Sequence, residues 1–411
     1  MPSIERLRKY ARLAVQVGAN VQPGQPLLIQ GSTDIREFIR LCVEEAYALG
    51  SKQVTVRWGD DPINHSTYQH CDVETLEEVP AWMVSQFDYY IEKGYALLSI
   101  TSPTPGLLAD IDPVKLQRAN VAMRKALHRW QENTMGNRTQ WCVIAAPTVA
   151  WANKVFPDLD AEQGVEALWE AILNAVRVTA DNDPVADWTK HNATLSAHNQ
   201  ALNDYNFKAL HFKNGLGTDL RVELVPNHIW AGGSEHNTQG VIFNPNLPTE
   251  ENFTMPYKFG VNGKVVATKP LNYQGRLIDG FWLNFKDGKA VEFGAEKEQE
   301  ALANLLSVDE GSSYLGEVAL ISHDSPISNS GVLFLNTLFD ENASCHLALG
   351  RAYPMNVKGG NDMTQDQLTA VGSNNSMEHC DFMFGSSDME ITGIRQDGSE
   401  VVVFTKGNFA F

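Results

Sequence analysis

The sequence predicts an α/β protein, with an N-terminal, mainly parallel α/β domain followed by an α+β domain rich in antiparallel strands. Three observations support this fold class. Helix and strand signals alternate through the first half, short strands with Asn-Gly or Asp-Gly turns fill the second half, and 411 residues exceed one ordinary core. The polar, turn-rich segment TADNDPVADW at 179–188 separates the two halves. We therefore expect one domain at 1–184 and another at 185–411.

Apolar strands and amphipathic helices alternate in the first half. The expected strands are PLLIQ at 26–30, QVTVRWG at 53–59, YALLSIT at 95–101 and QWCVIAA at 140–146. The expected helices begin with one near the N-terminus and continue at 34–49, 73–94, 113–132 and 161–179. Strands joined by helices favour right-handed crossovers and a parallel sheet. Because no glycine-rich phosphate loop follows a strand, a nucleotide site has no support.

The second half begins with a polar helix at 185–203, after which the sequence pattern changes to short strands separated by turn signals. The expected hairpin turns are KNGLGTDL at 213–220, VNGK at 261–264, KDGK at 286–289 and RQDGS at 395–399. One further helix is expected at 295–306. Short strands joined by tight turns predict mainly antiparallel pairing here.

Composition restricts the partners and the cell compartment. A net charge of −18 argues against nucleic acid or an anionic membrane as the main partner, because both attract basic surfaces. The N-terminus lacks the apolar stretch of a signal peptide, and no apolar run is long enough to span a membrane. The five cysteines are scattered and odd in number, which favours reduced thiols in a cytoplasmic protein.

Four segments of the second half hold acidic or histidine residues in apolar or proline-bounded contexts. They are NPNLPTEENFTMP at 244–256, YLGEVALIS at 314–322, LFDENASCHLALGRAYP at 338–354 and SMEHCDFMFG at 376–385. Glu317 lies within an apolar strand, where a carboxylate is costly to bury without a cation. The alternative is an edge strand on which Glu317 faces water.

His379 and Asp381 lie two residues apart in a strand-like run, so their side chains share one face, with Cα atoms about 6.6 Å apart. Cys380 points the other way. His346 begins an apolar strand and, taken alone, is more typical of a hydrogen-bonded core histidine than of a metal ligand. Taken together, oxygen and nitrogen donors without sulfur suit Zn²⁺, Co²⁺ or Mn²⁺. Five residues of this type occur in the four segments, more than one tetrahedral ion needs, so they favour a bridged pair of ions.

The chain resembles the aminopeptidase T, aminopeptidase S and PepS family of metalloaminopeptidases. The resemblance rests on NLPTEE-x-FT-x-P, GEVAL, TLFDENASCHLALG-x-AYP and H-x-DFM-x-G, in family order, and on YARLAVQVGANVQPGQPLLI at 10–29. It implies an active-site tyrosine at Tyr353 and six metal ligands: Glu251, Glu317, Glu341, His346, His379 and Asp381. Glu341 has an alternative role as an unliganded general base. Asn252 stands where an apolar residue is expected, and we expect this change to affect the pocket lining rather than the metal ligands.

The resemblance implies a metal-dependent aminopeptidase that hydrolyses N-terminal residues from peptides through a water activated by two divalent metal ions. Residues 185–411 would then form the catalytic domain, and the protein would be a homodimer acting on peptides with a free N-terminus. Two alternatives remain. One is a different dinuclear hydrolase, such as an amidase or a phosphoesterase. The other is a non-enzymatic protein that binds metal or peptides.

Overall fold

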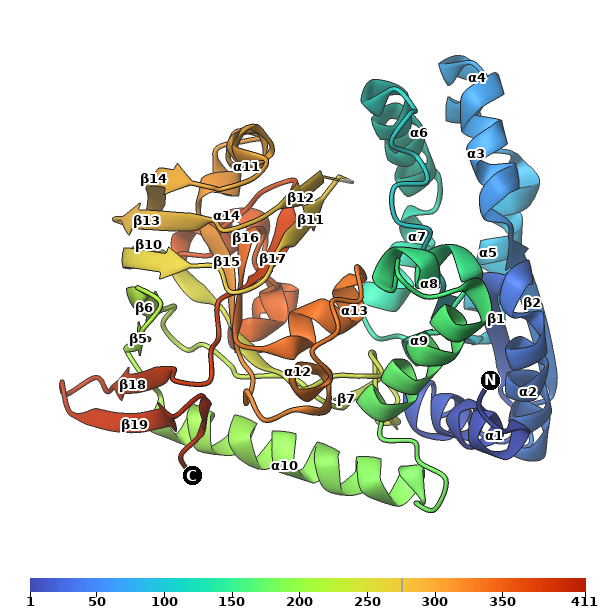
Figure 1. The fold of residues 1–411 in the computed structure, drawn as a ribbon, viewed down its shortest axis with the longest axis horizontal. Coiled ribbons are helices and arrows are strands. Elements are labelled where there is room, and N and C mark those ends of the chain that lie inside the picture. Colours follow the sequence, from blue (N-terminus) through green and yellow to red (C-terminus); the bar gives the residue numbers. More distant parts are fainter. Residues whose placement is uncertain (275) are drawn as a thin grey trace. The chain divides into compact units, whose positions relative to one another are not determined.

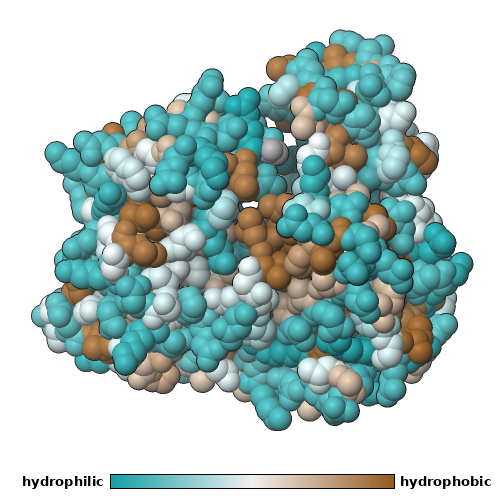
Figure 2. Space-filling view, viewed as in Figure 1, coloured by the Kyte–Doolittle hydropathy of each residue, from teal (hydrophilic) through white to brown (hydrophobic). Residues whose placement is uncertain are grey.

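The computed structural model describes residues 1–274 and 276–411, which divide into two compact units. The first unit comprises Met1–Lys190 and Ser234–Pro248, and the second comprises His191–Gly233 and Thr249–Phe411. These units differ from the expected domain ranges in placing residues 185–190 and 234–248 with the first unit. The division into domains at 184 and 185 stays a prediction. The face of the molecule in Figure 2 is mostly hydrophilic, with separate hydrophobic areas.

The first unit contains a four-stranded parallel sheet in the order β2-β1-β3-β4. Its strands are β1 (Pro26–Ser32), β2 (Gln53–Gly59), β3 (Ala96–Thr101) and β4 (Trp141–Ala145). Consecutive residues Leu27, Leu28 and Ile29 of the central strand β1 are all buried, which is typical of a parallel sheet covered on both faces. The predicted parallel sheet is therefore confirmed.

Helices precede, connect and follow these strands along the chain (Figure 1). They are α1 (Ile4–Leu13), α2 (Arg36–Ala48), α3 (Asp61–His70), α4 (Val73–Glu77), α5 (Ala81–Lys93), α6 (Pro113–Ala126), α7 (His128–Met135), α8 (Val149–Val155) and α9 (Ala161–Ala175). The prediction of one continuous helix at 73–94 is wrong, and the segment forms α4 and α5 instead. The chain is extended at Pro80, because a proline ring opposes continuation of a helix. The helix expected at 113–132 is likewise interrupted at Leu127.

The second unit contains an eight-stranded sheet in the order β14-β13-β10-β6-β5-β18-β19-β20, in which neighbouring strands are antiparallel. Its strands are β5 (Ala209–Lys213), β6 (Asp219–Leu224), β10 (Pro256–Val266), β13 (Trp282–Lys286), β14 (Lys289–Gly294), β18 (Glu390–Ile394), β19 (Glu400–Thr405) and β20 (Asn408–Phe409). The long helix α10 (Pro184–Tyr205) precedes it. The antiparallel-rich second half is confirmed.

Three of the four expected hairpin turns are present, at 213–220, 286–289 and 395–399. The turn expected at VNGK is wrong, because β10 runs straight through it and Asn262 pairs with Arg221. Gly263 has a φ of 114°, and a Cβ there would lie 2.2 Å from the Asp219 carbonyl oxygen. This glycine therefore permits close strand contact rather than a reversal.

A second antiparallel sheet carries the acidic and histidine residues. Its order is β17-β16-β15-β9, formed by β9 (Asn252–Thr254), β15 (Leu315–Leu320), β16 (His346–Gly350) and β17 (His379–Met383). Figure 1 shows β15, β16 and β17 side by side. One face packs into the main apolar core through Val318, Leu347 and Phe382. Strand alternation directs the residues between them to the opposite face.

The remaining elements are short. They are β7 (Glu235–His236), β8 (Ile242–Phe243), β11 (Leu271–Tyr273), β12 (Arg276–Ile278), α11 (Gln299–Leu306), α12 (Pro326–Ser330), α13 (Thr337–Asp340) and α14 (Gln365–Ala370). Helix α11 begins four residues later than expected. None of the helices in the described part of the chain combines the length and apolar character that crossing a bilayer requires.

Candidate metal centre

Strand register places four of the candidate ligands on one face of the β9–β15–β16–β17 sheet: Glu317, His346, His379 and Asp381. Ala348 in the central strand pairs with Glu317 on one side and with Asp381 on the other. His346 and His379 lie two residues from Ala348 and Asp381 along their own strands, so they share this face. The small residue Ala348 therefore lies between Glu317 and Asp381 in one row across three strands.

Two groups of donor atoms share Glu317. Its Oε1 lies 3.3 Å from His346 Nε2, which is also 3.4 Å from Glu251 Oε2. Ligand atoms of these three residues all lie within 4.8 Å of one another. The other oxygen, Glu317 Oε2, lies 3.7 Å from His379 Nε2, which is 3.5 Å from Asp381 Oδ1. One buried carboxylate therefore faces a different histidine with each of its oxygens.

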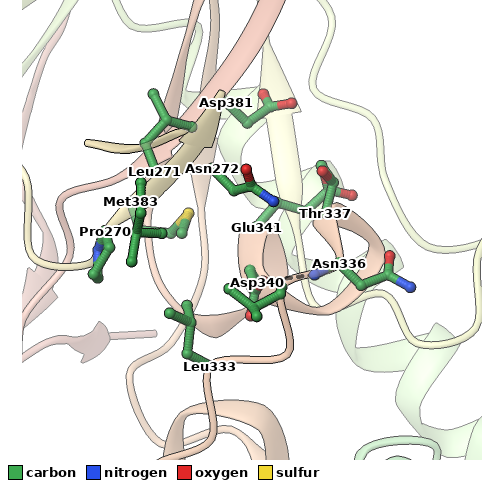
Figure 3. Close-up of a pocket in the computed structure, with 12 residues that line it drawn as sticks. Pro270, Leu271, Asn272, Leu333, Asn336, Thr337, Asp340, Glu341, Asp381 and Met383 are labelled. Atoms are coloured by element: carbon green, nitrogen blue, oxygen red, sulfur yellow. Dashed lines mark hydrogen bonds between the residues drawn. The ribbon is translucent and has the colours of Figure 1, made fainter. Parts of the chain in front are cut away.

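Glu341 and Tyr353 border these two groups. Glu341 begins a short 3-10 turn (Glu341–Ala343) before β16, and it lines one pocket together with Asp381 (Figure 3). Burial, and then the negative charges of Asp381 and Glu251, raise the pKa of Glu341 well above its ordinary value. The Tyr353 ring centroid lies 4.7 Å from that of His379. The structure thus brings all seven predicted site residues to one region.

Comparison with known proteins identifies the family. Residues 3–409 match the family described as thermophilic metalloprotease (M29). The chain belongs to the M29 family. It is therefore a metallopeptidase, so the predicted family resemblance and the prediction of an enzyme that hydrolyses peptide bonds are confirmed.

Similar M29 proteins match along nearly their whole length. Aminopeptidase 2 of Geobacillus stearothermophilus is 45% identical over 407 residues, covering 99% of this chain and 98% of the relative. Aminopeptidase AmpS of Bacillus subtilis is also 45% identical over 407 residues, covering 99% of each chain. The solved structure of wild-type AmpT from Thermus thermophilus has a TM-score of 0.92 at 38% identity and covers 99% of both chains. The predicted fold class is confirmed.

The charges of the site fit the divalent ions that an M29 metallopeptidase requires. Four carboxylates, those of Glu251, Glu317, Glu341 and Asp381, lie with two imidazoles, so acidic groups outnumber basic ones in this buried region. Burial and the neighbouring carboxylates raise the pKa of Glu341, which shows that without a cation the full negative charge of the cluster is disfavoured. Among the described residues, no lysine or arginine lies within ion-pair distance of Glu251, Glu317, Glu341 or Asp381. Metal cations are therefore the natural counter-charge.

The tautomer of His379 also favours metal binding. His379 Nδ1 lies 2.7 Å from the backbone carbonyl oxygen of Arg351, so Nδ1–H donates to that oxygen. In the neutral ring, Nε2 then carries the lone pair and faces two carboxylates. A carbonyl bonded to the outer nitrogen is a common arrangement behind metal-bound histidine. Without metal, burial opposes protonation, but Asp381 and Glu317 outweigh it and raise the pKa of His379 to about 10.

Asn252, which replaces the apolar residue expected after Glu251, fastens the Glu251 segment to α10. Its side-chain Nδ2 donates to the Leu195 carbonyl at 2.9 Å and to Asn199 Oδ1 at 2.7 Å. Asn199 Nδ2 in turn donates to the Gly232 carbonyl at 3.0 Å. Gly232 has a φ of 131°, and a Cβ there would lie 2.1 Å from the Glu251 carbonyl oxygen. The sequence position that departs from the family pattern thus has a structural function.

Asn199→Ala is expected to lower the free energy of unfolding of the metal-free protein by about 1–3 kcal/mol. The substitution leaves the Gly232 carbonyl and one Asn252 N–H without their partner in a partly buried region. Urea unfolding measures the loss, and Gln200→Ala, an exposed position on the same helix, is the control. Equal stability of the Asn199→Ala variant and the control would show that this link is unimportant.

Asp309 orders the loop that leads into His379. Its Oδ1 accepts hydrogen bonds from the Ser312 backbone N–H at 2.9 Å and the Ser376 hydroxyl at 2.8 Å, and its Oδ2 accepts one from the Met377 N–H at 2.7 Å. Burial opposes ionisation, but these hydrogen bonds outweigh it and hold the pKa of Asp309 below its ordinary value. The ionised carboxylate therefore stabilises the folded state.

Asp309→Ala is expected to lower the stability of the metal-free protein by about 1–2 kcal/mol at pH 7. Because the folded-state pKa is depressed, this contribution is present above the unfolded value of about 4 and is lost as the pH falls through the folded value. Urea unfolding at pH 7 and below pH 4 tests this, with the exposed neighbour Glu310→Ala as control. A difference from wild type that persists undiminished below pH 4 would contradict the account.

Sequence reasoning missed the residues that support the ligands. Ala348 gave no signal, because a small residue in an apolar strand is ordinary until its pairing partners are known. The Arg351 backbone carbonyl has no side-chain signature at all. Asn252 did give a signal, as a polar residue in an apolar position of a family motif, and it predicted a change in pocket lining rather than the link to α10.

Proposed function

We propose that this M29 metallopeptidase is an aminopeptidase that removes N-terminal residues from peptides and uses two divalent metal ions. One observation carries the two-metal proposal: Glu317 Oε1 faces His346 Nε2 at 3.3 Å while Glu317 Oε2 faces His379 Nε2 at 3.7 Å. A carboxylate with each oxygen directed to a separate histidine is suited to bridging two ions. The aminopeptidase proposal is supported by relatives that are named aminopeptidases.

The donor atoms divide into two sets. Glu251, His346 and Glu317 would hold one ion, and His379, Asp381 and Glu317 the other. Glu341 would be the sixth ligand, because its strongest electrostatic interactions are with Asp381 of one set and Glu251 of the other. Its alternative role as a general base stays open to test. Zn²⁺, Co²⁺ and Mn²⁺ all accept this set of oxygen and nitrogen donors.

The residues around the ions have distinct tasks in hydrolysis. Two bound divalent ions would supply an activated water and stabilise negative charge that develops on the substrate carbonyl. Tyr353 would donate a hydrogen bond to that carbonyl oxygen. Burial and the charges of Glu317 and Asp381 raise the pKa of Tyr353, so its hydroxyl keeps its proton at neutral pH. Selectivity for a free N-terminus needs an anionic group that binds the substrate ammonium, and Glu250, next to the ligand Glu251, is our candidate. Its side chain is buried, with Oε2 3.6 Å from His191 Nε2.

A panel of amino-acid p-nitroanilides tests the proposed function. We expect hydrolysis of the free aminoacyl anilides, no hydrolysis of their N-acetylated counterparts, loss of activity after chelation, and recovery with Zn²⁺, Co²⁺ or Mn²⁺. Activity on phosphate esters instead would favour a dinuclear phosphoesterase, although Arg351, the arginine nearest in sequence to the ligands, is exposed and donates to the Ser376 carbonyl. Metal binding without any hydrolysis would favour a non-enzymatic binding protein.

The assembly and location of the protein are further proposals. We propose a homodimer in the cytoplasm, with peptides as its partners. All five cysteines are free in the structure, which supports a reducing compartment. Size-exclusion chromatography with light scattering at micromolar concentration tests the dimer, and a single-chain mass would exclude it.

A further inference from the structure

A pocket of about 60 Å³ lies beside two of the proposed metal ligands, Glu341 and Asp381. In Figure 3, Asp381 lies at the top of this pocket and Leu333 at the bottom, with Leu271, Met383 and Pro270 along one side. Six apolar side chains line it: Pro270, Leu271, Leu277, Leu333, Leu335 and Met383. Asn272 and Thr337, which also line it, are exposed and form a polar rim.

The third carboxylate that lines the pocket, Asp340, accepts hydrogen bonds from two backbone amides. Its Oδ1 accepts from the Phe334 N–H at 2.7 Å and its Oδ2 from the Asn336 N–H at 2.9 Å. The side chain is buried. Because both oxygens are already engaged, Asp340 is poorly placed to receive a cationic side chain. No lysine or arginine is among the residues that line the described part of the pocket.

The Asp340 carboxylate also fixes an unusual backbone at the pocket wall. Leu335 lies between the two amides that Asp340 binds and has a φ of 55°, a left-handed conformation that is rare for a residue with a branched side chain. Such a conformation persists only where the surroundings impose it, and it is concentrated at functional sites. The hydrogen bonds to Asp340 therefore hold the segment 333–336 in a defined conformation at the wall of the pocket.

We propose that this pocket receives the side chain of the substrate's first residue and selects aliphatic chains such as that of leucine. This inference rests on the proposed aminopeptidase function. The first residue carries the carbonyl that is cleaved, and its side chain branches one atom from that carbonyl, so its pocket must adjoin the metal ligands. The pocket is smaller than the cavity of about 150 Å³ that accommodates a benzene ring, which disfavours aromatic side chains.

Two substitutions change the pocket in opposite directions. Leu335→Ala enlarges it and is expected to raise the ratio of kcat/KM for phenylalanyl- over leucyl-p-nitroanilide about tenfold or more. Leu333→Phe fills it and is expected to raise the ratio for alanyl- over leucyl-p-nitroanilide by a similar factor. Leu216→Ala, an exposed leucine in the turn between β5 and β6, is the matched control and should leave both ratios unchanged. Ratios between substrates do not depend on the fraction of folded or metal-loaded enzyme.

The result expected for wild type is that leucyl-p-nitroanilide has a higher kcat/KM than the phenylalanyl, lysyl and alanyl substrates. The proposal is overturned if wild type prefers the lysyl or phenylalanyl substrate, or if both pocket variants keep the wild-type ratios. If metal-loaded wild type hydrolyses no anilide, the proposed function fails, and calorimetry with free L-leucine then tests the pocket assignment separately. Tighter binding of L-leucine than of L-lysine, with this difference absent in Leu335→Ala, supports the assignment. Equal binding of the two amino acids overturns it.

Discussion

Glu317→Ala is expected to reduce kcat/KM for leucyl-p-nitroanilide by about a thousandfold or more, which corresponds to about 4 kcal/mol of transition-state stabilisation. Each Glu317 oxygen faces a different histidine, so the substitution removes a donor from both proposed ion sites at once. The same variant is expected to bind less metal. Elemental analysis after dialysis measures the metal content, and the anilide assay measures the rate.

Two further variants sharpen this prediction. Glu317→Gln keeps the size of the side chain and removes its charge, so it should lose activity nearly as completely and exclude a purely steric explanation. Glu292→Gln changes an exposed glutamate on β14 and should behave like wild type. If Glu317→Ala keeps full activity and full metal content, the assignment of the site is wrong.

Tyr353→Phe has the second largest expected effect. The substitution keeps the ring that packs 4.7 Å from the His379 ring and removes only the hydroxyl. Because this hydroxyl is proposed to stabilise charge that develops during the reaction, kcat should fall about 100-fold, while KM and metal affinity stay near their wild-type values. Steady-state kinetics and competition with a chromogenic chelator measure the three quantities.

The pattern of the Tyr353→Phe result identifies the role of the hydroxyl. A raised KM with unchanged kcat would place Tyr353 in ground-state substrate binding instead. A weakened metal affinity would make it part of the support of the site. Tyr314→Phe, at a tyrosine that packs against Phe259 and Lys258, is a control for loss of a hydroxyl elsewhere in the same unit.

Local sequence patterns predicted the β-strands of the site well. The alternation that places His379 and Asp381 on one face is a property of any extended chain, so it needed no tertiary information. The apolar neighbours of Glu317 left two positions open, a buried one and an edge strand facing water, and the structure shows Glu317 buried on the inner strand β15. Pairing was different, because which strand lies beside which, and therefore the row formed by Glu317, Ala348 and Asp381, depends on contacts distant in sequence.

The wrong hairpin prediction has the same origin. The Asn-Gly pair at 262–263 is an ordinary hairpin signal, and only its pairing with β6 shows that its glycine serves a close backbone approach within β10. The segment 244–256 is one continuous motif in the sequence, yet the compact units separate within it, between Pro248 and Thr249. Tertiary packing decides where one compact unit ends and the next begins, and local sequence patterns do not predict that packing.

The number of divalent ions bound per chain at full activity tests the central claim most directly. Metal-free protein is titrated with Zn²⁺ or Co²⁺ while bound metal and anilide hydrolysis are followed in the same sample. The two sets of donors that share Glu317 predict that activity reaches its maximum at two ions per chain, and that Glu317→Gln does not reach this stoichiometry. Full activity with one ion per chain would contradict the account.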